Sequence, residues 1–150
     1  MRIAIGSDHA GYALKEEVKA ALKAMKHDVE DCGCFSTESS DYPDAAQSVA
    51  KAVQAGAAER GVLVCSTGIG ISIAANRHPG VRAALCFTCD MAERAREHND
   101  ANVICFGARQ TQPADARAML EAFLATPFSR EERHRRRIGK IDCPATGEGA

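Results

Sequence analysis

The chain has 150 residues, of which 45% are apolar and 26% are charged, and its formal net charge is −1. These values are typical of a globular protein with one domain, here residues 1–150, and the charge gives no sign of a nucleic-acid partner. No apolar run approaches the roughly 20 residues of a membrane span, and the N-terminal sequence MRIAIGSDH is too short for a secretory signal, so we expect a cytoplasmic protein without a membrane partner.

Short apolar segments alternate with longer amphipathic segments along the chain, which predicts a parallel sheet covered by helices. The strands are expected at residues 2–6, 28–31, 61–65, 81–87 and 103–106. The helices are expected at residues 12–25, 43–56, 71–76, 90–98, 113–124 and 129–140. The pattern therefore predicts an α/β fold, a three-layer α/β/α sandwich with a five-stranded parallel sheet, followed by a flexible tail at residues 144–150.

Two polar residues, Asp8 and His9, follow the first expected strand. Ligands of open parallel sheets bind beyond the carboxyl ends of the strands, so this turn is a candidate site for hydroxyl groups or phosphate. A simpler interpretation is that Asp8 caps the next helix and that His9 has no role.

The expected strand at residues 61–65 runs into a glycine-rich loop, Cys65-Ser66-Thr67-Gly68-Ile69-Gly70. Glycines allow backbone N–H groups to approach a ligand, and the start of a helix favours negative charge. Such a loop can hold a phosphate or an oxyanion, and it favours the thiolate form of Cys65. The alternative is a buried cysteine followed by an ordinary turn.

Several known glycine-loop sites do not fit this segment. The dinucleotide fingerprint needs a third glycine where Ile73 stands, and the Gly-Lys-Ser/Thr of a P-loop is missing. A cysteine phosphatase would need an arginine shortly after Cys65, but the residues through Ala75 are uncharged. Phosphoryl transfer through Cys65 is therefore not expected.

The seven cysteines do not indicate a disulfide framework, because their number is odd and several lie in apolar runs. The Cys86/Cys89 pair has the spacing of half a zinc knuckle but no second pair, and Cys32/Cys34 is too closely spaced for common zinc sites. We therefore expect no metal.

Polar and basic residues also mark the second half of the chain. His98 and Asn99 form a polar turn, which a simple helix end would also explain, and Arg109 follows the last strand. The final helix carries Arg133 and Arg137 four residues apart, on one helix face. This helix is a solvated face, a nucleic-acid patch or a phosphate clamp, and we expect it to dock on a partner subunit.

Together these segments resemble the ribose-5-phosphate isomerase B family, also called the RpiB/LacA/LacB family, over roughly residues 1–141. The resemblance rests on six motifs in the same order and spacing: Gly6-Ser-Asp8-His9-Ala-Gly11, Asp41-Tyr42-Pro43, Cys65-Ser-Thr67-Gly68-Ile-Gly70-Ile-Ser-Ile-Ala-Ala-Asn76, His98-Asn99-Asp-Ala-Asn102, Gly107-Ala-Arg109 and Arg133-His-Arg-Arg-Arg137.

The resemblance implies a Rossmann-like fold, metal-free aldose–ketose isomerisation without an organic cofactor, and a homodimer, or a tetramer, with active sites at the subunit interface. It implies that Cys65 moves the proton between C1 and C2, that Thr67 and the loop hold the enediolate oxygen, and that His98 opens the sugar ring. The implied substrate-binding residues are Asp8, Tyr42 and Asn99 for hydroxyl groups, His9 and Arg109 with the partner's Arg133 and Arg137 for phosphate, and Ser66, Gly68 and Gly70 in the loop.

Two positions place the chain within this family. A branch with a glutamate base has that residue where Ile71 stands, so this chain is similar to the cysteine branch. Ser66 stands where that branch commonly has glycine, which leaves the sugar preference open.

The resulting prediction is interconversion of D-ribose 5-phosphate and D-ribulose 5-phosphate in the pentose phosphate pathway. Galactose 6-phosphate, allose 6-phosphate or a tetrose phosphate would keep the same chemistry. A nucleotide-binding regulatory module and a basic-helix nucleic-acid binder are the alternatives from other classes.

Overall fold

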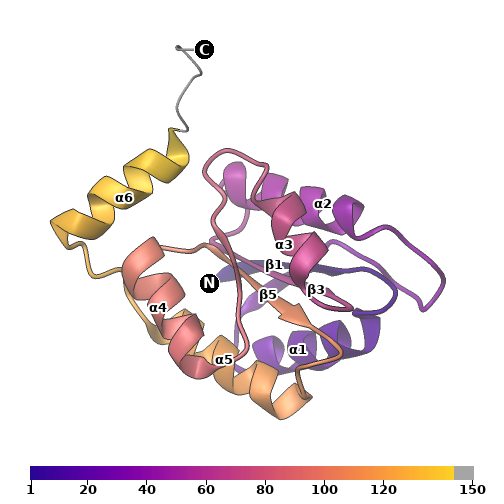
Figure 1. Ribbon diagram of the computed structural model, residues 1–150. Coiled ribbons are helices and arrows are strands. Elements are labelled where there is room, and N and C mark those ends of the chain that lie inside the picture. Colours follow the sequence, from indigo (N-terminus) through magenta and orange to yellow (C-terminus); the bar gives the residue numbers. More distant parts are fainter. Residues whose placement is uncertain (144–150) are drawn as a thin grey trace, which may run out of the picture.

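The computed structural model describes residues 1–143, and its centre is an entirely parallel five-stranded sheet (Figure 1). The strands are β1 (Arg2–Ser7), β2 (Asp28–Asp31), β3 (Arg60–Cys65), β4 (Ala83–Leu85) and β5 (Val103–Gly107). Their order across the sheet is β2-β1-β3-β5-β4. The predicted sheet, including the number and direction of its strands, is confirmed.

Helices cover both faces of the sheet. One face carries α1 (Tyr12–Ala24), α4 (Cys89–Asn99) and α5 (Pro113–Ala125), and the other carries α2 (Tyr42–Gln54) and α3 (Ile69–Ala75). Successive side chains of a strand point to opposite faces, so Val62 and Val64 pack under the first group of helices while Leu63 and Cys65 pack under the second. The predicted three-layer sandwich is confirmed, and Cys65 belongs to the α2/α3 side.

The chain order has a switch point between β1 and β3, where open α/β sheets have a crevice. The chain passes from β1 to β2 on one side of β1 and then returns to β3 on the other side. Such a reversal separates the loops that follow the two strands, and ligands of open α/β sheets bind there. Asp8 and Cys65 flank this crevice, because they stand at the ends of β1 and β3.

The last helix, α6 (Glu132–Asp142), lies beside α4 and outside the two helix layers (Figure 1). It begins later than the predicted residue 129, because the Ser129 backbone N–H donates to the carbonyl of Glu97 and Arg130 has a positive φ of 59°. Its docking on a partner stays a prediction, and the predicted tail at residues 144–150 lies outside the described residues.

Strand β4 is shorter than the predicted 81–87. At its start, the Arg82 backbone N–H donates to the side chain of Asn102 at 2.9 Å. A side-chain hydrogen bond thus stands where a backbone bond to a neighbouring strand would continue β4. At its end, Phe87 is exposed and starts the turn into α4. In the described part of the chain, no helix is long and apolar enough to cross a membrane.

Candidate active site

The loops after β1, β3 and β5 are joined by backbone hydrogen bonds. The Asp8 N–H donates to the Val64 carbonyl at 3.2 Å. On the other side of β3, the N–H groups of Ala108 and Arg109 donate to the carbonyls of Cys65 and Ser66 at 2.9 and 3.0 Å. The backbone of Arg109 is therefore fixed to the cysteine loop, although the residue itself is exposed.

Cys65 is buried, with 3% of its surface exposed, and it accepts a hydrogen bond from the backbone. The Gly68 N–H donates to Cys65 Sγ at 3.1 Å. The other buried thiols of the described chain, Cys86 and Cys105, receive no such N–H; Cys86 instead donates to a carbonyl. Among the buried thiols of residues 1–143, Cys65 is therefore the one whose sulfur accepts a backbone N–H, a contact that favours negative charge on an acceptor.

The two other buried thiols stay protonated at neutral pH. Burial raises the pKa of the Cys86 thiol to about 12. Burial also raises the pKa of Cys105 well above its ordinary value, and the neighbouring Cys86 and Cys65 add to this effect. Cys86 and Cys89 do not form a knuckle, because the first is buried and the second is exposed.

Gly68 holds this geometry because no other residue fits its position. Its φ is 76°, and a Cβ atom there would lie 2.4 Å from Leu85 Cδ1 and 2.9 Å from the backbone of Phe106. The preceding residue of the loop, Thr67, is half-buried, and its Oγ1 accepts from the Ile69 N–H at 3.3 Å. Ser66 is also half-buried at the mouth of the loop.

Tyr42 closes the loop from the side of α2. A Cβ atom on Gly70 would lie 2.6 Å from Tyr42 Cζ and 2.9 Å from its hydroxyl oxygen. The phenol therefore rests directly on the glycine loop, although 40% of Tyr42 is exposed. This close approach explains why position 70 needs a residue without a side chain.

Asp8 and His9 are held by different partners. Asp8 is buried, and its Oδ1 accepts from the Gly11 N–H at 2.8 Å in the turn before α1. The N-cap of α1 is Gly11, without a side-chain cap, so Asp8 holds this turn and is not the helix cap of the simpler interpretation. His9 Nδ1 lies 3.1 Å from both the backbone N and the backbone O of Ser40. The histidine ring is thus oriented by the loop between β2 and α2.

The opposite edge of the sheet carries His98 and Asn99. They end α4, and β5 follows, so their turn lies at the amino ends of the strands. Two contacts confirm this position: the Gly61 N–H donates to the Asn102 carbonyl, and Arg82 Nε donates to the Asn99 carbonyl, both at 2.9 Å. About 13 Å of β3 separates Gly61 from Cys65, at about 3.3 Å per residue.

The predicted site residues therefore form two groups within one chain. We call the first the cysteine half; it consists of Asp8, His9, Tyr42, Cys65, Ser66, Thr67, Gly68, Gly70 and Arg109. We call the second the histidine half; it consists of His98, Asn99, Arg133 and Arg137, at the ends of α4 and on α6. The fold does not bring these halves together in a single chain.

His134 packs against the histidine half, and sequence reasoning did not single it out. Its ring is buried and stacks on His98, with centroids 4.4 Å apart and an interplanar angle of 10°. Among the described residues, its Nε2 has no hydrogen-bond partner. Burial, followed by the nearby His98 and Arg133, lowers the pKa of His134. The sequence offered one indication of this position, because His134 is the only residue without a formal charge between Arg133 and Arg137.

No three histidine, cysteine or carboxylate side chains of residues 1–143 cluster in a way that could hold a metal ion. The cysteine half instead offers a thiol, a hydroxyl, an imidazole and backbone N–H donors around one crevice. These groups can move a proton at carbon and stabilise the oxyanion that forms next to it.

Comparisons with known proteins agree with this chemistry. Residues 3–141 match the family model described as Ribose/Galactose Isomerase. The chain is 41% identical over 140 residues to ribose-5-phosphate isomerase B of Escherichia coli, with 93% of each chain covered. It is 40% identical to ribose-5-phosphate isomerase B of Mycobacterium tuberculosis (H37Rv), covering 92% of this chain and 86% of the relative.

Solved structures give the same result. The crystal structure of a ribose 5-phosphate isomerase of Thermotoga maritima matches with a TM-score of 0.92 and 49% identity, covering 94% of this chain and 97% of that one. Type B ribose 5-phosphate isomerase of Trypanosoma brucei matches with a TM-score of 0.91 and 46% identity, covering 95% and 97%.

Proposed function

The chain belongs to the ribose/galactose isomerase family, and we propose that it interconverts D-ribose 5-phosphate and D-ribulose 5-phosphate through an enediolate, with Cys65 as the base. It is an aldose–ketose isomerase. The observation that carries the role of Cys65 is the hydrogen bond from Gly68 N–H to its sulfur, at the crevice between β1 and β3. Relatives named as ribose 5-phosphate isomerases favour this substrate over galactose 6-phosphate, allose 6-phosphate and tetrose phosphates.

The reaction begins once the sugar ring has opened. The Cys65 thiolate removes the proton from C2 of the aldose, and the electrons of that bond form the C1=C2 bond. The carbonyl oxygen then carries the negative charge, beside Thr67 and the loop N–H groups. The Cys65 thiol then returns its proton to C1. The proton of the C2 hydroxyl passes to the oxyanion on C1, so that the carbonyl now lies at C2 and the ketose forms.

The two halves of the site suggest how the remaining roles are filled. We propose a homodimer in which the histidine half of one subunit completes the cysteine half of its partner. In this arrangement, the partner's His98 opens the furanose ring, because imidazole has a pKa near neutrality and can both donate and accept a proton. The exposed Arg133 and Arg137 would then join His9 and Arg109 at the phosphate.

This isomerase needs no metal or organic cofactor in the proposed steps, and we place it in the pentose phosphate pathway of the cytoplasm. A nucleotide-binding module or a nucleic-acid binder is the weaker alternative, since neither uses a thiol, an imidazole and paired arginines together. Nucleotide-dependent thermal stabilisation without isomerase activity would support the module.

A steady-state assay without added metal tests the proposal. Ribose 5-phosphate is compared with allose 6-phosphate, galactose 6-phosphate and erythrose 4-phosphate. We expect ribose 5-phosphate to have the highest kcat/KM, and Cys65→Ala to lower kcat about 10²- to 10⁴-fold, the usual contribution of a positioned base. Cys89→Ala is the control, because this thiol is exposed and belongs to the start of α4, not to the loop at residues 65–70. Full activity of Cys65→Ala would exclude the proposed base, and a different leading sugar would exclude the proposed substrate.

A further inference from the structure

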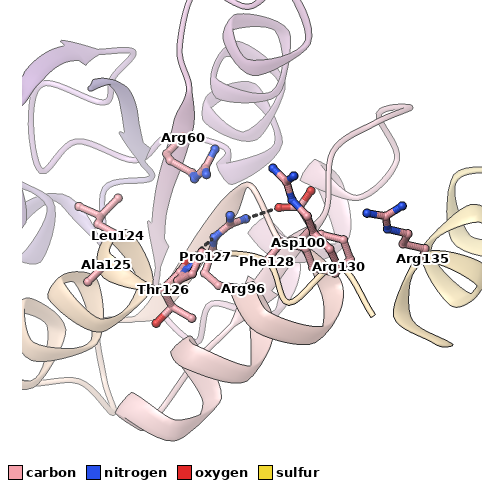
Figure 2. A pocket seen from close by; sticks show the side chains of 10 residues that line it. All are labelled: Arg60, Arg96, Asp100, Leu124, Ala125, Thr126, Pro127, Phe128, Arg130 and Arg135. Atoms are coloured by element: carbon pink, nitrogen blue, oxygen red, sulfur yellow. Dashed lines mark hydrogen bonds and ion pairs between the residues drawn. The ribbon is translucent and has the colours of Figure 1, made fainter. Parts of the chain in front are cut away.

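A basic pocket opens at the amino edge of the sheet, away from Cys65. Its volume is about 640 Å³, within the range of small-molecule sites. It lies where the start of β3, the α4–β5 turn, the α5–α6 connection and α6 meet. Figure 2 shows four arginines of its lining, Arg60, Arg96, Arg130 and Arg135, which come from these separate segments.

The pocket holds more positive than negative charge. Its lining contains one carboxylate, Asp100, and Arg96 Nη1 donates to it at 2.7 Å. The Asp100 carboxylate also pairs with Arg82, which lies outside the pocket, at 3.3 Å. One negative charge is therefore divided between two arginines. Arg96 is 4% exposed and is held further by the carbonyls of Ala101 and Thr126, so its charge is fixed at the pocket wall.

The other guanidinium groups of the pocket are available to a ligand. Arg60 donates to the backbone carbonyl of its neighbour Glu59, which leaves the rest of its fork for other acceptors. Burial, and then the positive charge of Arg96, lowers the pKa of Arg60, so the two cations repel each other. Arg130 and Arg135 are exposed at the rim (Figure 2).

No residue of either half of the proposed active site lines this pocket, although the pocket shares the α4–β5 turn with His98 and Asn99. On α6, His134 faces α4 and stacks on His98. Arg133 and Arg137 are one helical turn apart, whereas Arg135 is two residues from each and therefore lies on the other side of the His134 row. Arg135 lines the pocket, and the two proposed phosphate-binding arginines of α6 are not part of its lining.

We propose that this pocket is a second anion site, which binds a small ligand that carries phosphate groups. Guanidinium forks pair with phosphate through two parallel hydrogen bonds, and a multiply charged phosphate offers enough acceptors for several arginines. A bound phosphate also removes the repulsion between Arg60 and Arg96. The site does not depend on the proposed isomerase reaction.

The test measures pyrophosphate binding by titration calorimetry at about 0.15 M salt, where the field of distant surface charges is screened. The protein carries Arg109→Gln and Arg137→Gln, which remove two arginines of the proposed substrate-phosphate site. We expect about one pyrophosphate per chain, and about tenfold weaker affinity when Arg135→Gln or Arg60→Gln is added, as for the loss of one charge-assisted contact.

Arg136→Gln is the matched control, because Arg136 is an exposed neighbour on the same helix and does not line the pocket. It should leave the affinity unchanged. Equal weakening by Arg136→Gln and Arg135→Gln would show a diffuse basic surface and overturn the proposal, as would no binding heat. Tighter binding of a single-stranded RNA than of pyrophosphate, weakened by both variants, would also overturn it and identify a nucleic-acid surface. Thermal melts confirm that each variant is folded.

Discussion

At the scale of single residues, the cysteine loop depends on a glycine that cannot be replaced. Gly68 combines a left-handed backbone with contacts that leave no room for a Cβ atom, and its N–H is the donor to Cys65 Sγ. The residue that positions the proposed base is therefore not one with reactive chemistry of its own. Gly68 acts through its backbone N–H, which points at the sulfur of Cys65.

Gly68→Ala should lower both stability and turnover. We expect the free energy of unfolding to fall by about 2 kcal/mol or more, from left-handed strain and from the contact with Leu85. The kcat should fall because the N–H moves away from the sulfur. Urea unfolding and steady-state kinetics measure the two effects.

Gly80→Ala is the control for Gly68→Ala, because Gly80 has the same φ of 76° but nothing within 4 Å of an added Cβ atom. It should cost about 1–2 kcal/mol through strain alone and leave kcat unchanged. A Gly68→Ala enzyme with normal kcat would contradict the role given to this N–H.

At the scale of elements, a buried lysine fixes the loop that leads to the active-site crevice. Lys15 of α1 has no exposed surface, and its Nζ lies 2.8 and 2.9 Å from the two carboxylate oxygens of Asp31 and 2.6 Å from the Cys34 carbonyl. The loop after β2 is in turn bonded to Ser7, because the Ser7 N–H donates to the Gly33 carbonyl at 2.6 Å. Packing between α1 and β2 thus positions the end of β1.

Asp31→Asn should lower the free energy of unfolding by about 3 kcal/mol at pH 7, since it removes the nearest carboxylate of the buried Lys15 and leaves only Glu16, at 3.3 Å. Burial opposes the ionisation of Asp31, but hydrogen bonds from Lys15, Lys19 and the Gly33 N–H hold its pKa below the ordinary value. A lowered carboxyl pKa stabilises the fold above about pH 4 and loses this effect as the pH falls through the folded-state pKa.

The difference between wild type and Asp31→Asn should therefore shrink below about pH 4. Urea unfolding across pH 3 to 7 measures it. Glu30→Gln, on the exposed side of the same strand, should change stability by about 0.5 kcal/mol or less. A constant difference at all pH values would argue against the ion pair as the cause.

At the scale of the whole molecule, the separation of the two halves leads to a test of the proposed dimer. Cys65→Ala disables the cysteine half and Arg137→Ala disables the histidine half. When the two inactive chains are expressed together, a mixed dimer has one site built from two intact halves. With random pairing, we expect about one quarter of wild-type activity per chain.

Co-expression of Cys65→Ala with His9→Ala is the control, because both changes lie in the cysteine half. No mixed dimer of this pair has an intact site, so activity should not return. Purification through a different affinity tag on each chain checks that mixed dimers form. If Cys65→Ala with Arg137→Ala also stays inactive while mixed dimers are present, the shared site is wrong.

The sequence by itself determined the parallel sheet, the sandwich and the cysteine half. Alternating apolar and amphipathic segments depend on local periodicity, and Asp8, Cys65 and Arg109 directly follow strands, whose carboxyl ends must share one edge. The sequence also placed His98 and Asn99 just before a strand, which is the signal that they belong to the other edge.

Only the tertiary structure decided which distant segments meet. The order β2-β1-β3-β5-β4, the stack of His134 on His98 and the meeting of Arg60, Arg96 and Arg135 around one pocket depend on how strands pair and how helices rotate as they pack. Local patterns fix which face of an element is buried. They do not fix its neighbour, because many partners bury the same apolar area, and only the packing of the complete chain selects one of them.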